Sequence, residues 1–102
     1  MENVITLIAT LTARPGKSDQ LGQMLGRMVE PSRSEEGCIT YNAHRSVADP
    51  DVWIMYENWR SKQDLDDHMQ LPPFKDFMKL AQDVLAKEVD FNFVTLMSPL
   101  AD

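Results

Sequence analysis

The order of apolar segments along the chain limits its fold more than any other feature. Four short segments rich in β-branched and aromatic residues alternate with segments whose apolar residues recur at helical spacing. The expected strands cover residues 4–12, 38–46, 52–59 and 89–97. Helical segments separate the first strand from the second and the third from the fourth. This order predicts an α+β, ferredoxin-like split β-α-β-β-α-β fold, with the helices on one face of an antiparallel sheet.

The first helical segment has a single apolar stripe, which predicts a helix packed on the sheet. Ser18 or Lys17 is expected to open this helix, and Asp19 suits its positive end. Pro31 is expected to distort or end the regular part, because proline lacks an N–H and clashes with the preceding turn. Gly37 is expected to close the segment in a left-handed conformation. The stripe consists of Leu21, Met24, Leu25, Met28 and Val29.

The second helical segment is expected to be broken. Ser61 and Asp64 resemble a capping box at the start of a short helix over residues 62–69. The sequence LPP then interrupts the helix near Pro72, because the residue before a proline is pushed out of helical geometry. A second apolar stripe follows this break. It consists of Phe74, Phe77, Met78, Ala81, Val84 and Leu85.

Residues 1–102 are expected to form a single domain, since the sequence has neither repeats nor a linker. The expected strands carry apolar residues on both faces, whereas the helices cover one face only. In a chain of 102 residues no second layer remains to cover the other face. The economical solution is a homodimer in which the two sheets pack face to face about a two-fold axis.

Charge and cysteine content argue against several classes of function. The formal net charge is −6, whereas nucleic acids and anionic membranes bind basic faces. No apolar run is long enough to span a bilayer, and the first residues lack the pattern of a signal peptide. With Cys38 as the single cysteine and two histidines, a metal site within one chain is not expected. A cytoplasmic location is the default expectation.

Four motifs, taken in order, resemble the antibiotic biosynthesis monooxygenase (ABM) family. They are ARPGK, EEGCITYNAHRS, DPDVWIMYENW and LDDHMQLPPFKDFM. The resemblance covers about residues 4–97 and implies a dimeric α+β barrel with a pocket between helices and sheet in each subunit. The family includes cofactor-independent quinol and anthrone monooxygenases, haem-degrading enzymes, and an isomerase of a phosphorylated autoinducer. Membership would therefore imply one fold, but it would leave several reactions open.

Glu57 and His68 are the candidate catalytic residues. Strand alternation places Glu57 on one face with its large apolar neighbours Trp53, Met55 and Trp59. One interpretation is an acid that pairs with an arginine and holds the strand end. The other is an acid whose pKa is raised by desolvation, so that it can exchange protons with a phenol or enol. A glutamate in a YExW motif recurs in the family, which favours a functional role. His68 has a near-neutral ordinary pKa that suits proton transfer, and its H-x-x-x-P-x-F context matches the family's pocket rim.

Further residues are expected to bind the substrate. In the monooxygenase relatives a tryptophan at this strand end lines the pocket, where a flat ring suits stacking on an aromatic molecule. Some relatives have an asparagine at the position of Met55, so the anthrone-type arrangement for oxygen activation is not reproduced. The hairpin register is open, and with it whether Tyr41 or His44 faces the pocket. The expected substrate-binding residues are Trp59, Phe74, Met55, Tyr41, His44 and Met78.

The leading hypothesis is a monooxygenase that needs no cofactor. Haem-degrading relatives carry an axial histidine after F-K, which the segment FKDFM lacks, and an asparagine where this chain has Ala9. The sequence also contains no flavin, nicotinamide or P-loop motif. The expected substrate is a small quinol-like or polycyclic aromatic molecule that reacts with dioxygen. The alternatives are an isomerase of a small phosphorylated carbonyl compound and a protein that only binds a small hydrophobic molecule.

Overall fold

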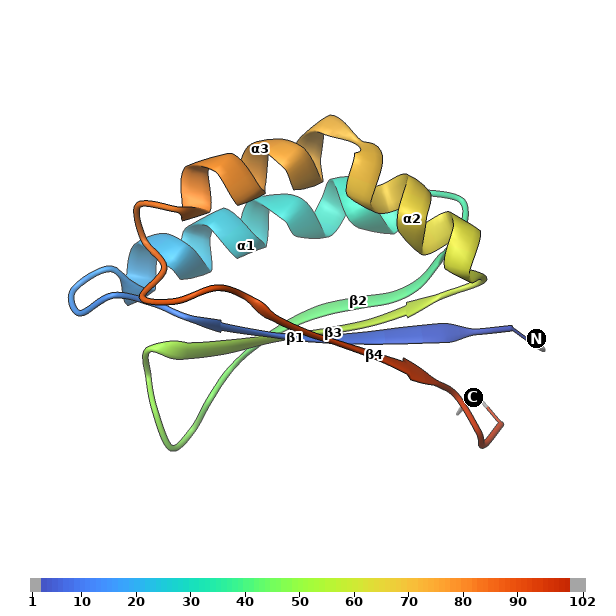
Figure 1. Ribbon diagram of the computed structural model, residues 1–102, viewed down its shortest axis with the longest axis horizontal. Helices are drawn as coiled ribbons and strands as arrows, with labels where there is room; N and C mark the ends of the chain where they lie inside the picture. Colours follow the sequence, from blue (N-terminus) through green and yellow to red (C-terminus); the bar gives the residue numbers. More distant parts are fainter. Residues whose placement is uncertain (1–2, 100–102) are drawn as a thin grey trace.

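The structure, a computed structural model, describes residues 3–99. Figure 1 shows a sheet with all the described helices on one face, while the described residues place no helix on the other face. The predicted ferredoxin-like α+β order is confirmed, and none of these helices has the length and apolar composition needed to cross a membrane. The elements are β1 (Ile5–Thr12), α1 (Ser18–Arg33), β2 (Cys38–Arg45), β3 (Val52–Trp59), α2 (Lys62–Gln70), α3 (Pro72–Ala81) and β4 (Asp90–Thr95).

The sheet is antiparallel, with the strand order β2-β3-β1-β4. Glu57 on β3 lies between Leu7 on β1 and Tyr41 on β2. His44 pairs instead with Ile54. Because successive side chains of a strand point to opposite faces, Tyr41 and Glu57 share the face under the helices and His44 lies on the opposite face. The register thereby decides the alternative between Tyr41 and His44 that the sequence leaves open.

The hydrophobic core lies between the helices and the sheet. Trp59 and Leu21 are fully buried, and the stripe predicted for the first helix supplies one side of the core. The second stripe is divided: Phe77 and Ala81 are buried on α3, whereas Val84 is buried in the turn that follows this helix. This packing fixes the positions of β3 and α3, between which the candidate site lies.

The structure departs from two expectations about the first helix and its exit. Of the two outcomes expected for Pro31, the end of the helix does not occur, because α1 continues to Arg33. The last turn is closed by Ser34, whose backbone N–H and Oγ both donate to the carbonyl of Glu30, at 3.1 and 3.0 Å. Gly37 is not left-handed, since the positive φ among residues 3–99 belongs to Gly16, at 80°. A Cβ at Gly37 would collide with the side chain of Asp64, so glycine is needed there for close approach.

The predicted break between α2 and α3 is confirmed. Ser61 caps α2: its Oγ accepts from the Asp64 N–H at 3.1 Å and donates to Asp64 Oδ2 at 2.9 Å. Arg60 adds two hydrogen bonds to the same carboxylate, and these bonds, with that from Ser61, lower the pKa of Asp64. Pro72 and Pro73 occupy the first positions of α3, where a missing N–H is tolerated.

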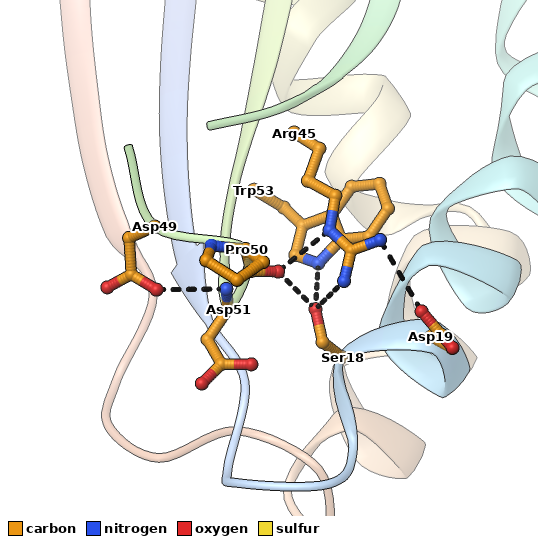
Figure 2. Close-up of polar contacts among 7 residues, drawn as sticks. All are labelled: Ser18, Asp19, Arg45, Asp49, Pro50, Asp51 and Trp53. Atoms are coloured by element: carbon orange, nitrogen blue, oxygen red, sulfur yellow. Dashed lines mark hydrogen bonds and ion pairs between the residues drawn. The ribbon is translucent and has the colours of Figure 1, made fainter. Parts of the chain in front are cut away.

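A polar cluster connects the start of α1 to the β2–β3 hairpin (Figure 2). The hydroxyl of Ser18 accepts from Trp53 Nε1 at 2.9 Å and from Arg45 Nη2 at 3.0 Å, and it donates to the carbonyl of Pro50. The Cζ atom of Arg45 also lies 4.9 Å from the centre of the Trp53 ring, and its Nη1 atom lies 3.4 Å from Oδ1 of Asp19. Three contacts between α1 and the hairpin therefore depend on one hydroxyl group, that of the buried Ser18.

Replacing Ser18 by alanine is expected to destabilise the fold by about 1–3 kcal/mol, because the half-buried Trp53 N–H loses its partner. Urea unfolding at fixed protein concentration measures the effect. Ser34→Ala is the matched control, since its hydroxyl is exposed and bonds only within its own helix end. Equal stabilities for the two variants would contradict the role assigned to Ser18.

Candidate active site

A narrow cavity lies between the sheet and the helices α1 and α3. It is apolar apart from the carboxyl group of Glu57 and the hydroxyl group of Tyr41. The sheet contributes Leu7, Ala9, Leu11, Tyr41, Met55, Glu57 and Phe91; the helices contribute Leu25, Met28, Phe74, Phe77 and Met78; Val89 completes the lining. One acid in an otherwise apolar, concave lining is typical of a small-molecule site.

The free space in this cavity is small. Centres of water molecules can occupy about 20 Å³ of it, which is room for about one water. An aromatic ring is larger, so its entry requires lining side chains to move. Met28, Met55 and Met78 can do so with little strain, because methionine is unbranched and adapts to irregular shapes.

Glu57 is the most unusual group in the lining. Its residue is 3 % exposed, and Oε1 accepts a hydrogen bond from Trp59 Nε1 at 3.0 Å. Burial raises the pKa of Glu57 to about 7, with a smaller rise from the charge of Glu35, while the Trp59 hydrogen bond opposes the rise. Near neutral pH this carboxyl group is therefore present in both protonation states, as a general acid or base requires.

Tyr41 lies beside Glu57 on the neighbouring strand. Its hydroxyl donates to Met28 Sδ at 4.0 Å, a weak contact. Burial, followed by the charge of Glu57, raises the pKa of Tyr41 well above its usual range. The phenol therefore stays protonated at neutral pH and can act as a hydrogen-bond donor, but not as a base. The half-buried Cys38 also stays protonated, because burial raises the pKa of its thiol to about 11.

His68 and Trp59 form a layer behind Glu57. The centres of their rings are 4.5 Å apart, and His68, which is 2 % exposed, lies edge-on to Tyr41 and Phe74. The Nδ1 atom of His68 is 3.0 Å from Oε2 of Glu35. This contact orients the His68 ring against the indole that holds Glu57.

The structure brings five of the eight predicted site residues to the cavity: Glu57, Tyr41, Met55, Phe74 and Met78. Trp59 is not part of the lining and contacts the site through its N–H. His68 is also outside the lining, behind Trp59. His44, exposed on the opposite face of the sheet, does not reach the cavity.

The sequence patterns did not indicate Glu35 or much of the apolar lining as part of the site. Strand alternation could have found Leu7 and Leu11, which share a face with Ala9, and Phe91, whose partner on β1 is Ala9. No local pattern marks Glu35. It follows α1 and reaches His68 only because the chain folds back over 33 positions.

Comparison with known proteins places the chain in a family. The family model described as "Antibiotic biosynthesis monooxygenase" matches residues 4–80. The chain belongs to this family. It is 30% identical over 100 residues to the Mycobacterium tuberculosis protein named "Putative monooxygenase Rv0793", with 98% of this chain and 95% of the relative covered. It is also 30% identical over 91 residues to "Uncharacterized protein sll1783" of Synechocystis sp., covering 89% of this chain but only 62% of that longer protein.

Solved structures agree with the fold of this ABM family member. The crystal structure of PA3566 from Pseudomonas aeruginosa superimposes with a TM-score of 0.90 at 33% sequence identity, covering 96% of this chain and 98% of the other. The similarity extends over β4, beyond the residues that the family model matches. The ABM resemblance and the ferredoxin-like fold expected from the sequence are both confirmed.

Proposed function

We propose that this ABM family member is a cofactor-independent monooxygenase of small hydroxyarenes, with Glu57 as the general base. The proposal rests mainly on one observation: a buried carboxyl group lines a cavity that is otherwise almost wholly apolar, and this burial raises the pKa of Glu57 to about 7. The name of the M. tuberculosis relative supports the reaction class. A base of this pKa is matched to proton transfer at neutral pH.

The reaction needs no external reductant. Glu57 takes the proton of a substrate hydroxyl group, and the resulting electron-rich phenolate transfers an electron to dioxygen. Recombination of the radical pair forms a carbon–oxygen bond, and the resulting peroxide takes back the proton held by Glu57. The hydroperoxide then loses water as the proton on the same carbon leaves, which gives the carbonyl group. For 1-naphthol the balance is naphthol plus O₂ giving 1,4-naphthoquinone plus water. The apolar lining excludes bulk water from the reacting centre and orients the ring.

Trp59 and His68 act through Glu57 in this proposal. The Trp59 N–H fixes Oε1, so that Oε2 is the oxygen left to accept the substrate proton. His68 holds the indole in place by ring contact and is itself oriented by Glu35. His68 is therefore proposed as a positioning residue, a different role from the direct proton transfer expected from the sequence.

Oxygen uptake by the purified protein tests the proposed function. With 1-naphthol, one mole of dioxygen should disappear for each mole of 1,4-naphthoquinone formed, without added flavin, haem or metal. Heat-denatured protein provides the background rate of oxidation. A panel of hydroxyarenes that bind but consume no oxygen above background would overturn the proposal, as would activity that depends on an added flavin, haem or metal.

We propose further that the face of the sheet without helices forms a homodimer. This face carries the exposed Tyr56 and Val94 and the half-buried Ile8 and Ile54. Light scattering should give about twice the chain mass of 11.7 kDa. Ile54→Asp should shift the protein towards monomer, because an unpaired charge is costly at an apolar interface, whereas Val47→Asp in the exposed hairpin loop should not. A parent protein that is monomeric at micromolar concentration would contradict the dimer.

A further inference from the structure

A second, larger hollow lies outside the cavity of Glu57. It is bounded by the end of α3, the segment that follows it and the start of β4, and it offers about 780 Å³ to the centres of water molecules. Met78, Val89 and Phe91 line both this hollow and the inner cavity. The two spaces therefore share one wall of apolar side chains, and the outer hollow, named the mouth below, adjoins the inner cavity at this wall.

The mouth is basic, although the chain as a whole is acidic. Arg14, Lys79 and Lys87 line it, together with the single acid Glu88, whereas the formal net charge of the chain is −6. In the part of the chain that the structure describes, none of these three cations lies within ion-pair distance of a carboxylate. Among residues 3–99, the four ion pairs that involve a lysine or an arginine lie elsewhere, so three cations without an ion-pair partner in that range gather at this opening.

Arg14 is held in place at the mouth. Its Nε donates to the carbonyl of Leu85 at 2.8 Å, and its Nη2 donates to the carbonyl of Gln82 at 3.3 Å. Two hydrogen bonds to backbone carbonyls fix the guanidinium plane but leave its charge uncompensated. A fixed guanidinium with two neighbouring lysines suits an anionic oxygen group, because charge-assisted hydrogen bonds to carboxylate or phosphate are the strong ones.

We infer that the substrate of this site is an amphipathic hydroxyarene that carries an anionic oxygen group. Its ring enters the inner cavity past Met78 and Phe91, and its carboxylate or phosphate stays in the outer hollow with Arg14, Lys79 and Lys87. The inference rests on the proposed function for the reacting end of the molecule. It adds the substrate class, which neither the family nor the relatives' names specify.

Anaerobic calorimetry with three matched probes tests the inference: 2-naphthol, 6-hydroxy-2-naphthoate and 6-hydroxynaphthalen-2-yl phosphate. At low salt the better anionic probe should bind about ten-fold more tightly than neutral 2-naphthol, and the preferred anion distinguishes a carboxylate from a phosphate. Added 0.5 M NaCl should reduce the advantage, since exposed charges are screened. If neither anion binds more tightly than 2-naphthol, or if no probe binds, the inference is wrong.

Lysine variants locate the effect. The double variant Lys79→Gln/Lys87→Gln should reduce the anionic advantage to about two-fold while leaving the affinity for 2-naphthol unchanged. Lys17→Gln/Lys75→Gln is the control: it removes the same charge from exposed positions outside the lining. Equal losses in both double variants would contradict a site at the mouth. Tighter binding of the anionic probes without oxygen uptake would overturn the proposed function but support the anionic site. Oxidation without any preference for the anionic probes would overturn the anionic site but support the proposed function.

Discussion

Replacing Glu57 by glutamine is expected to lower kcat by roughly 10²–10⁴-fold, the usual range for loss of a positioned acid or base. Glutamine keeps the shape of the side chain and can still accept the Trp59 N–H at Oε1. It cannot take up a proton at neutral pH, so the loss should appear in kcat more than in substrate affinity. Oxygen uptake at saturating 1-naphthol, with binding measured anaerobically on the same samples, separates the two quantities.

If Glu57 is the base, the activity of the parent protein should rise as the pH rises through about 7, because Glu57 becomes a carboxylate over that range. Trp59→Phe supplies a control that acts on the same group. Its N–H lowers the pKa of Glu57, so its removal should move the midpoint of the pH–rate profile to higher pH. If Glu57→Gln keeps full activity, or if Trp59→Phe leaves the midpoint unchanged, Glu57 is not the base.

The sequence predicted the fold better than the site because the two depend on different information. Apolar spacing and the prolines at 72 and 73 fix the order of elements locally, and the structure follows that order. Whether Tyr41 or His44 faces the cavity depends on which residues of β2 and β3 pair. The turn between the two strands does not encode this register. Alternation within β3 correctly grouped Met55, Glu57 and Trp59 on one face.

His68 illustrates the remaining limit. The sequence predicted the short helix that carries His68. The orientation of its ring, however, depends on Glu35, which contacts it from the segment after α1. A partly buried contact between distant segments thus helps to decide whether a histidine faces a cavity or supports the wall behind it. Pro31 does not end α1 for a local reason: it lies so near the end of the helix that the hydrogen bonds of Ser34 to Glu30 complete the turn around it.

The contribution of Glu57 to the free energy of unfolding should fall as the pH rises from about 4.5 to about 7. In the unfolded chain Glu57 loses its proton near its ordinary pKa of 4.5, whereas in the folded chain it keeps the proton up to about 7. Between these values the folded state binds more protons, so stability decreases with pH. At about 1.4 kcal/mol for each pH unit, the free energy of unfolding falls by up to about 3 kcal/mol between the two pKa values of Glu57. Asp64, whose pKa is lowered by Arg60, acts in the opposite sense at lower pH.

Urea unfolding of the parent and of Glu57→Gln at pH 5, 6, 7 and 8, at one protein concentration, measures this cost. The two proteins should differ least near pH 5, and the glutamine variant should be the more stable by up to about 3 kcal/mol at pH 8, since it carries no buried charge there. Glu30→Gln is the matched control: its side chain is exposed on α1, and its substitution should leave the parent's pH dependence intact. Parallel curves for the parent and Glu57→Gln would mean that Glu57 ionises normally in the folded protein. The base proposed for the reaction would then lose its physical basis, because a carboxylate with an ordinary pKa is a poor acceptor for a phenolic proton.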